Sequence, residues 1–130
     1  MLGIKTNGGS GMQVELMREY TFDAAHHLEW HPGKCRSLHG HTYRMEVTVV
    51  GQLDERGVVM DFAELDEVVD REVLDVYDHT LLNNLIPNPT AEHVAAEICA
   101  RLRSAGIPVS EVRLWETPRS SVRVRPPVSP

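Results

Sequence analysis

Hydrophobic and polar residues alternate along two stretches in the first half of the chain. Between residues 14 and 27, apolar side chains share one parity, with an interruption at Arg18. From about His41 to Gly51 the alternation is regular, and its apolar positions are Tyr43, Met45, Val47 and Val49. A period of two predicts strands with one buried and one polar face. Between them, Pro32 and Gly33 predict a loop.

After position 61 the period changes to three or four residues, which predicts helices. Asp61 is a suitable N-cap, and Glu64 completes a capping-box pattern. The apolar residues that follow at helical spacing are Phe62, Leu65, Val69, Val73 and Val76. A second helix is expected to begin at the N-cap Thr90 and to stop at Gly106. Its buried face would consist of Val94, Ala95, Ile98 and Leu102.

Two short strands are expected near the end of the chain, at residues 111–116 and 122–125. The order strand, strand, helix, helix, strand, strand predicts an α+β domain, with a four-stranded antiparallel sheet and both helices on one face. We assign residues 1–12 to a disordered leader, 13–126 to a single domain and 127–130 to a tail. The open edges of such a sheet favour pairing with another copy of the chain.

Composition narrows the class of protein. The chain has 130 residues, enough for one domain with a core. A formal net charge of -6 disfavours a nucleic-acid partner. The sequence has no apolar run near about 18 residues, so no membrane span is predicted, and its first residues lack the apolar core of a signal peptide. Two cysteines make no disulfide framework, which favours a cytoplasmic location.

The histidines suggest a metal site. His39 and His41 are two residues apart in a predicted strand, so both imidazoles can face one point. A catalytic zinc site usually has three protein ligands. His26 continues the apolar face of the first strand and would meet this pair in a hairpin, whereas His27 would point away unless a bulge reverses the parity. His31 is expected to be exposed.

We therefore predict that His26, His39 and His41 bind a metal ion. Three imidazoles without a carboxylate favour zinc over copper or iron. The alternative is a polar, histidine-rich loop that binds no metal.

The chain's two cysteines have different surroundings. Cys99 lies on the apolar side of the second predicted helix and is expected to be an inert core thiol. Cys35 lies in a polar loop between Lys34 and Arg36, and positive neighbours are typical of reactive cysteines. From these residues alone, Cys35 is either a fourth zinc ligand, which would close the site, or a catalytic base or nucleophile.

Two further positions carry candidate chemistry. Asp78 and His79 come where the first helix is expected to end. The histidine there can interact with the helix dipole, or the pair can transfer protons. Glu116 ends a predicted strand. Its carboxylate is either a solvated strand end or an acceptor of two hydrogen bonds from a flat N–H/NH2 edge, as in a guanine-like ring.

Six short motifs occur in order along the chain. They are F-x-A-A-H (22–26), C-x-x-x-H-G-H (35–41), D-F-A-E-L (61–65), D-H (78–79), N-P-T-A-E (88–92) and W-E-T (115–117). Together, over residues 13–126, they resemble the 6-pyruvoyltetrahydropterin synthase family, and particularly its 6-carboxytetrahydropterin synthase branch. In that branch three residues separate the cysteine from the histidine, as between Cys35 and His39. The pyruvoyl-forming enzymes carry a longer insertion, and a branch that cleaves dihydroneopterin has a glutamate in this loop.

The resemblance implies the T-fold, in which the sheets of several subunits join into a barrel, as a trimer or a dimer of trimers. It implies zinc on the three predicted histidines. It also implies that Cys35 is catalytic and that Asp78 and His79 form a proton relay, which works with Cys35 across a subunit boundary.

The resemblance also implies how the substrate is bound. Glu116 would anchor the amino-pyrimidine edge of a pterin, with Thr90 a weaker candidate for the same pocket. Lys34 and Arg36 are candidates to meet the triphosphate of the substrate. Glu92 is left as a favourable charge at a helix N-terminus.

The implied reaction is the zinc-dependent conversion of 7,8-dihydroneopterin triphosphate into 6-carboxytetrahydropterin, acetaldehyde and triphosphate, in the queuosine (7-deazaguanine) pathway. One alternative is the 6-pyruvoyl product. Another is a non-catalytic zinc or pterin-binding module, against which the free thiol and the Asp-His pair argue. A zinc hydrolase is disfavoured because no carboxylate base is evident beside the histidines.

Overall fold

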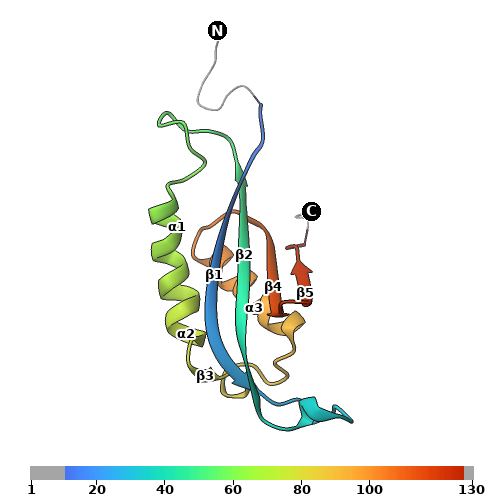
Figure 1. Cartoon of the computed structure of the whole chain (residues 1–130). Coiled ribbons are helices and arrows are strands. Elements are labelled where there is room, and N and C mark those ends of the chain that lie inside the picture. Colours follow the sequence, from blue (N-terminus) through green and yellow to red (C-terminus); the bar gives the residue numbers. More distant parts are fainter. Residues whose placement is uncertain (1–10, 128–130) are drawn as a thin grey trace.

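The computed structural model describes residues 11–127, which form a β-sheet with helices packed against one face (Figure 1). The strands are β1 (Val14–His26), β2 (His39–Gly51), β3 (Thr80–Leu81), β4 (Val109–Thr117) and β5 (Ser120–Val124). Their order in the sheet is β3-β1-β2-β4-β5. The predicted α+β class is confirmed. The predicted leader and tail lie almost entirely outside the described residues, and their disorder stays a prediction.

The sheet has a fifth strand that the sequence analysis did not predict. β3 is two residues long and lies parallel to β1, with Ala24 opposite Thr80. The turn before it is held by the His79 N–H, which donates to the Asp23 carbonyl at 2.6 Å. The prediction of a four-stranded, purely antiparallel sheet was therefore wrong, although the four longer strands do pair antiparallel. A strand of two residues is too short to produce a periodic pattern.

β1 and β2 form a long hairpin with an unbroken register, which runs from Val14 opposite Gly51 to His26 opposite His39. Phe22 of β1 stacks on Tyr43 of β2 with 5.1 Å between the ring centroids, so the apolar faces of the two strands lie on the same side. Because the pairing extends to the end of β1, β2 begins at His39 and includes both histidines of the His-Gly-His motif.

The helices begin where their caps predict. They are α1 (Phe62–Val69), a π-helical turn η2 (Asp70–Leu74), α2 (Asp75–Tyr77) and α3 (Ala91–Ser104), with short 3-10 turns η1 (Lys34–Arg36) and η3 (Leu82–Asn84). The Asp61 carboxylate accepts from the Ala63 N–H at 2.8 Å, and Glu64 accepts from the Asp61 N–H, which completes the capping box. The Thr90 hydroxyl accepts from the His93 N–H at 3.2 Å.

The π-helical turn η2 is a second feature that sequence periodicity did not predict. A π-helical turn adds a residue, so the turn that follows is rotated relative to a regular α-helix. Tyr77, rather than Val76, is consequently the fully buried residue of the last turn, with 2% of its surface exposed. Arg101 of α3 donates from Nε to the Glu72 carbonyl at 2.7 Å and so satisfies a backbone oxygen of η2.

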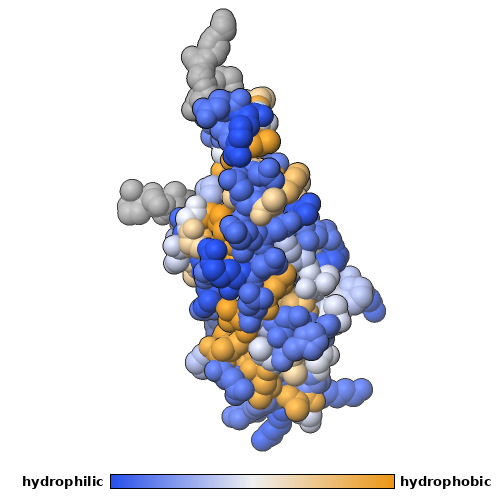
Figure 2. Space-filling model, turned by 90° about the vertical axis from the view of Figure 1, so that its left-hand side faces the viewer, coloured by the Kyte–Doolittle hydropathy of each residue, from blue (hydrophilic) through white to orange (hydrophobic). Residues whose placement is uncertain are grey.

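One apolar core lies between the helices and the inner face of the sheet. Met45 of β2, Leu65 of α1 and Ile98 of α3 are fully buried in it. Cys99 is also buried there, as predicted, and burial raises the pKa of its thiol. Figure 2 shows that the α1 side of the molecule is largely hydrophilic, with apolar groups exposed between the polar ones. Within residues 11–127, no helix is long and apolar enough to cross a membrane.

Candidate metal centre and adjoining cavity

The three predicted histidines converge where β1 ends and β2 begins. Their nearest ring nitrogens all lie within 4.8 Å of one another. His26 is fully buried, while His39 and His41 are half-buried. The hairpin register explains this convergence, because His26 pairs with His39 and the two strands present these side chains on one face.

Backbone carbonyls fix which nitrogen of two of these rings points at the shared centre. His26 donates from Nδ1 to the Pro89 carbonyl at 2.7 Å, and His39 donates from Nδ1 to the Ser37 carbonyl at 2.7 Å. In the neutral rings the proton is therefore on Nδ1, and Nε2 carries a lone pair. The two Nε2 atoms face each other at 3.0 Å. Metal-binding histidines are commonly oriented by such hydrogen bonds.

His41 completes the set of nitrogen donors. Its Nε2 atom is buried and has no hydrogen-bond partner among the described residues. Burial lowers the pKa of His41, with the nearby Glu116 carboxylate opposing the shift. The lowered pKa favours the neutral ring, which is the form that binds a metal ion.

The donor set fits a divalent cation such as zinc. Lone pairs that face each other at 3.0 Å repel unless a positive charge lies between or beside them. Two imidazole nitrogens on one tetrahedral zinc ion would be separated by roughly 3.3 Å, close to the distance found here.

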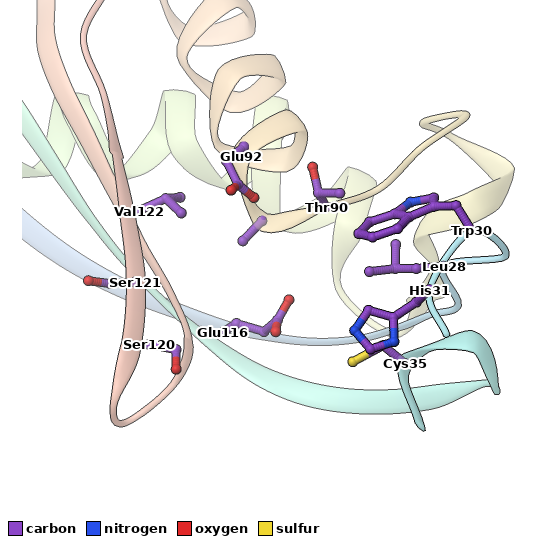
Figure 3. Close-up of a pocket in the computed structure, with 11 residues that line it drawn as sticks. Leu28, Trp30, His31, Cys35, Thr90, Glu92, Glu116, Ser120, Ser121 and Val122 are labelled. Carbon is purple, nitrogen blue, oxygen red and sulfur yellow. The ribbon is translucent and has the colours of Figure 1, made fainter. Parts of the chain in front are cut away.

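A cavity of about 500 Å³ adjoins this centre. Three predicted site residues line it, Cys35, Thr90 and Glu116 (Figure 3). Cys35 is half-buried in η1 and lies outside the histidine cluster. Figure 3 shows Glu116 on one side of the cavity and Cys35 on the other. The thiol and the carboxylate therefore face the same space from two different elements, η1 and β4.

Lys34 and Arg36 behave differently from the cysteine between them. Both are exposed, and neither lines the cavity. If they contact a triphosphate, as predicted, they would do so at the rim of the cavity.

Asp78 and His79 lie at a separate concavity, which His79 lines together with Asp23 and His41. The His79 Nδ1 atom is 3.0 Å from Asp78 Oδ2, and Asp78 Oδ1 accepts from the Asp23 N–H at 2.9 Å. This backbone donor, followed by the His79 ring, lowers the pKa of Asp78. His79 has φ +59°, the left-handed conformation, which is uncommon outside glycine. The structure therefore pairs these two residues but does not bring them to Cys35 within one chain.

Sequence reasoning missed several residues of the cavity wall. His31 was expected to be exposed, but it is half-buried and lines the cavity with Trp30 and Glu92. The Trp30 indole N–H donates to the Asn88 side chain at 2.9 Å, a contact between residues 58 positions apart. Short-range patterns carry no signal for such a contact.

Glu116 is also closer to the histidines than expected. Its carboxylate oxygens lie 3.7 Å from His26 Nε2 and 3.8 Å from His41 Nε2. The sequence analysis disfavoured a zinc hydrolase because no carboxylate was evident beside the histidines. That premise is wrong, because the folded chain brings Glu116 beside them.

Comparisons with known proteins identify relatives that cover most of this chain. A 6-carboxy-5,6,7,8-tetrahydropterin synthase of Synechocystis is 40% identical, covering 83% of this chain and 90% of that protein. Another of the same name from Haemophilus influenzae is 37% identical, covering 82% and 94%. A dihydroneopterin monophosphate aldolase of Pyrococcus furiosus is 38% identical, covering 81% and 91%.

The fold is shared as well. The structure of Caenorhabditis elegans 6-pyruvoyl tetrahydropterin synthase superimposes with a TM-score of 0.81 at 28% identity, covering 89% of this chain and 97% of that one. The family model described as 6-pyruvoyl tetrahydropterin synthase matches residues 15–127. Because sequence and fold agree over almost all of the described residues, this chain belongs to the 6-pyruvoyl tetrahydropterin synthase family.

Proposed function

We propose that this protein is a zinc-dependent 6-carboxy-5,6,7,8-tetrahydropterin synthase. It would convert 7,8-dihydroneopterin triphosphate into 6-carboxytetrahydropterin, acetaldehyde and triphosphate, in 7-deazaguanine biosynthesis. The observation that supports the proposal is a cavity lined by a thiol, Cys35, and by a carboxylate, Glu116, which itself reaches the cluster of three histidines. Relatives at 37% and 40% identity that bear this name support the choice of product.

His26, His39 and His41 would hold the zinc ion. When bound, zinc would supply a Lewis acid that stabilises negative charge on oxygen atoms of the substrate's side chain. The backbone hydrogen bonds of His26 and His39 would keep their Nε2 lone pairs directed at the ion.

The cavity residues would bind and orient the pterin. The two oxygens of the Glu116 carboxylate can accept two parallel hydrogen bonds from the N–H/NH2 edge of the ring, and Thr90 would contact the same ring. Fixing the ring in this way would place the side chain of the substrate near both the histidines and Cys35, which is a positioning contribution to the rate. Lys34 and Arg36 would contact the triphosphate at the rim.

Proton transfer would use two groups. Cys35, as a thiolate, would remove a proton bound to carbon in the side chain of the substrate. His79, oriented through Nδ1 by Asp78, would hold or return a proton at Nε2. His79 and Cys35 line different concavities of one chain, so their cooperation would require the His79 of a second copy. We therefore propose a homo-oligomer, a trimer or a dimer of trimers.

A second candidate function is cleavage of a dihydroneopterin to a hydroxymethylpterin, which the aldolase of Pyrococcus furiosus favours by its name. The loop between Cys35 and His39 contains arginine, serine and leucine, without the glutamate expected of that branch. The 6-pyruvoyl product is the other alternative within the family.

One incubation separates these reactions. Zinc-loaded protein is mixed with 7,8-dihydroneopterin triphosphate, and the products are identified by mass. We expect 6-carboxytetrahydropterin with acetaldehyde, formed by the wild-type protein and not by Cys35→Ala. A hydroxymethylpterin, a 6-pyruvoyl product or unchanged substrate would overturn the proposal.

A further inference from the structure

Glu116 lines the cavity and also lies beside the histidine cluster. One oxygen of its carboxylate is 3.7 Å from His26 Nε2, and the other is 3.8 Å from His41 Nε2. The side chain comes from the end of β4, which pairs with β2 through Arg44 opposite Trp115. It therefore approaches the histidines from a different strand than either of the two that carry them.

These contacts are difficult to explain as ordinary ion pairs. His26 donates from Nδ1 to a backbone carbonyl, so in the neutral ring its Nε2 presents a lone pair to the carboxylate. His41 Nε2 is buried and has no hydrogen-bond partner among the described residues. Lone pairs and a carboxylate thus face a common point. That convergence is favourable only around a cation.

We infer that Glu116 is a displaceable fourth donor to the metal centre. Without substrate, its carboxylate would hold the metal ion together with the three histidines. Histidine nitrogen and carboxylate oxygen are both ordinary zinc ligands, so the four donors suit zinc. Cys35, which is outside the histidine cluster, would not be a ligand of the metal ion.

The same carboxylate is the anchor assigned to the pterin, so this part of the inference rests on the proposed function. A pterin that donates two hydrogen bonds to Glu116 would draw the carboxylate away from the metal ion and leave a coordination position open to the substrate. Recognition of the ring would then be coupled to the opening of the metal centre. A ring without the N–H/NH2 edge would not produce this opening.

The first test measures metal affinity, which is independent of catalysis. Zinc dissociation constants are determined by competition with a chromophoric chelator for the wild type, Glu116→Gln and Glu92→Gln. Glu92 is the matched control, because it is a second carboxylate of the same cavity wall and does not belong to the histidine cluster. We expect Glu116→Gln to weaken zinc binding by about tenfold or more, and Glu92→Gln to leave it within about twofold. Equal affinities for Glu116→Gln and wild type would overturn the inference.

The second test observes the coordination sphere directly, through the visible spectrum of the cobalt(II)-substituted protein. The probe is unsubstituted pterin, which has the amino-pyrimidine edge but no side chain that could reach the metal. Lumazine, which lacks the amino group, is the matched control ligand.

We expect pterin, and not lumazine, to shift the spectrum of the wild type, and neither ligand to shift that of Glu116→Gln. If pterin binds the wild type without a spectral change, displacement of the carboxylate is wrong although the proposed function stands. If pterin does not bind at all, both the displacement and the proposed function fail, while the zinc affinities still decide whether Glu116 is a donor.

Discussion

The Asp78→Asn substitution tests the proposed proton relay through the tautomer of one histidine. In the wild type, Asp78 Oδ1 accepts from the Asp23 N–H at 2.9 Å, and Oδ2 lies 3.0 Å from His79 Nδ1. An ionised carboxylate has no proton to donate, so His79 must carry its proton on Nδ1 and present the Nε2 lone pair. The Asp23 N–H lowers the pKa of Asp78, and the carboxylate therefore stays ionised at neutral pH.

Asparagine would reverse this arrangement. Its carbonyl oxygen can still accept from the Asp23 N–H, and this leaves its NH2 group facing His79 Nδ1. The histidine must then accept at Nδ1 and carry its proton on Nε2, where it can no longer take a proton from the substrate. We expect kcat to fall by about 100- to 10,000-fold, the usual contribution of a positioned acid–base group. KM should change little, because Asp78 does not line the cavity in which we propose that the pterin binds.

The assay is steady-state kinetics of zinc-loaded Asp78→Asn with dihydroneopterin triphosphate, beside zinc content and thermal unfolding. Asp75→Asn, an exposed carboxylate of α2 in the preceding turn, is the matched control and should behave as the wild type. Zinc content and the unfolding midpoint should be unchanged, because Asp78 is exposed and outside the histidine cluster. A kcat within about threefold of the wild type would refute the tautomer argument.

Four further predictions follow from the same structure. Cys35→Ala should keep its zinc and lose turnover, whereas loss of zinc would show that the thiol is a ligand. Mixed oligomers of Cys35→Ala and Asp78→Asn subunits should regain activity if each active site lies between two subunits. Pterin binding should quench the fluorescence of Trp115→Phe, which keeps Trp30 in the cavity wall, and not that of Trp30→Phe, which keeps Trp115. The Trp115 ring centroid lies 3.6 Å from the Arg44 guanidinium carbon, outside the cavity lining, so quenching in both variants would mean that the pterin binds elsewhere. Leu65→Ala, at a fully buried core position, should lower the free energy of unfolding by about 2–5 kcal/mol in urea denaturation, and a loss under about 1 kcal/mol would contradict the packing. Hydrogen bonds from the Tyr20 hydroxyl, 2.6 Å away, and then from Arg18 lower the pKa of Asp66. The difference in unfolding free energy between wild type and Asp66→Asn should therefore be complete above the unfolded pKa of about 4, and it should disappear as the pH falls through the folded pKa. A difference that persists at pH 2 would show another cause.

Sequence periodicity by itself determined the hairpin and the histidine cluster. Alternation assigns each residue of a strand to one face, and antiparallel pairing of two adjacent strands is a local event. These two facts were sufficient to group His26 with His39 and His41 and to exclude His27. The helix starts were equally local, because a cap at Asp61 or Thr90 acts on the backbone within three residues.

Only the tertiary structure decided which other groups meet the histidines. Glu116 reaches them because β4 pairs with β2, and Trp30 and His31 form a wall because a loop folds back to Asn88. Such contacts join residues far apart in the chain, whose separation no local period encodes. The same holds for β3, which pairs in parallel with β1, more than 50 positions earlier in the chain. Local strand alternation thus specified the histidine cluster, whereas long-range strand pairing specified the carboxylate that faces it.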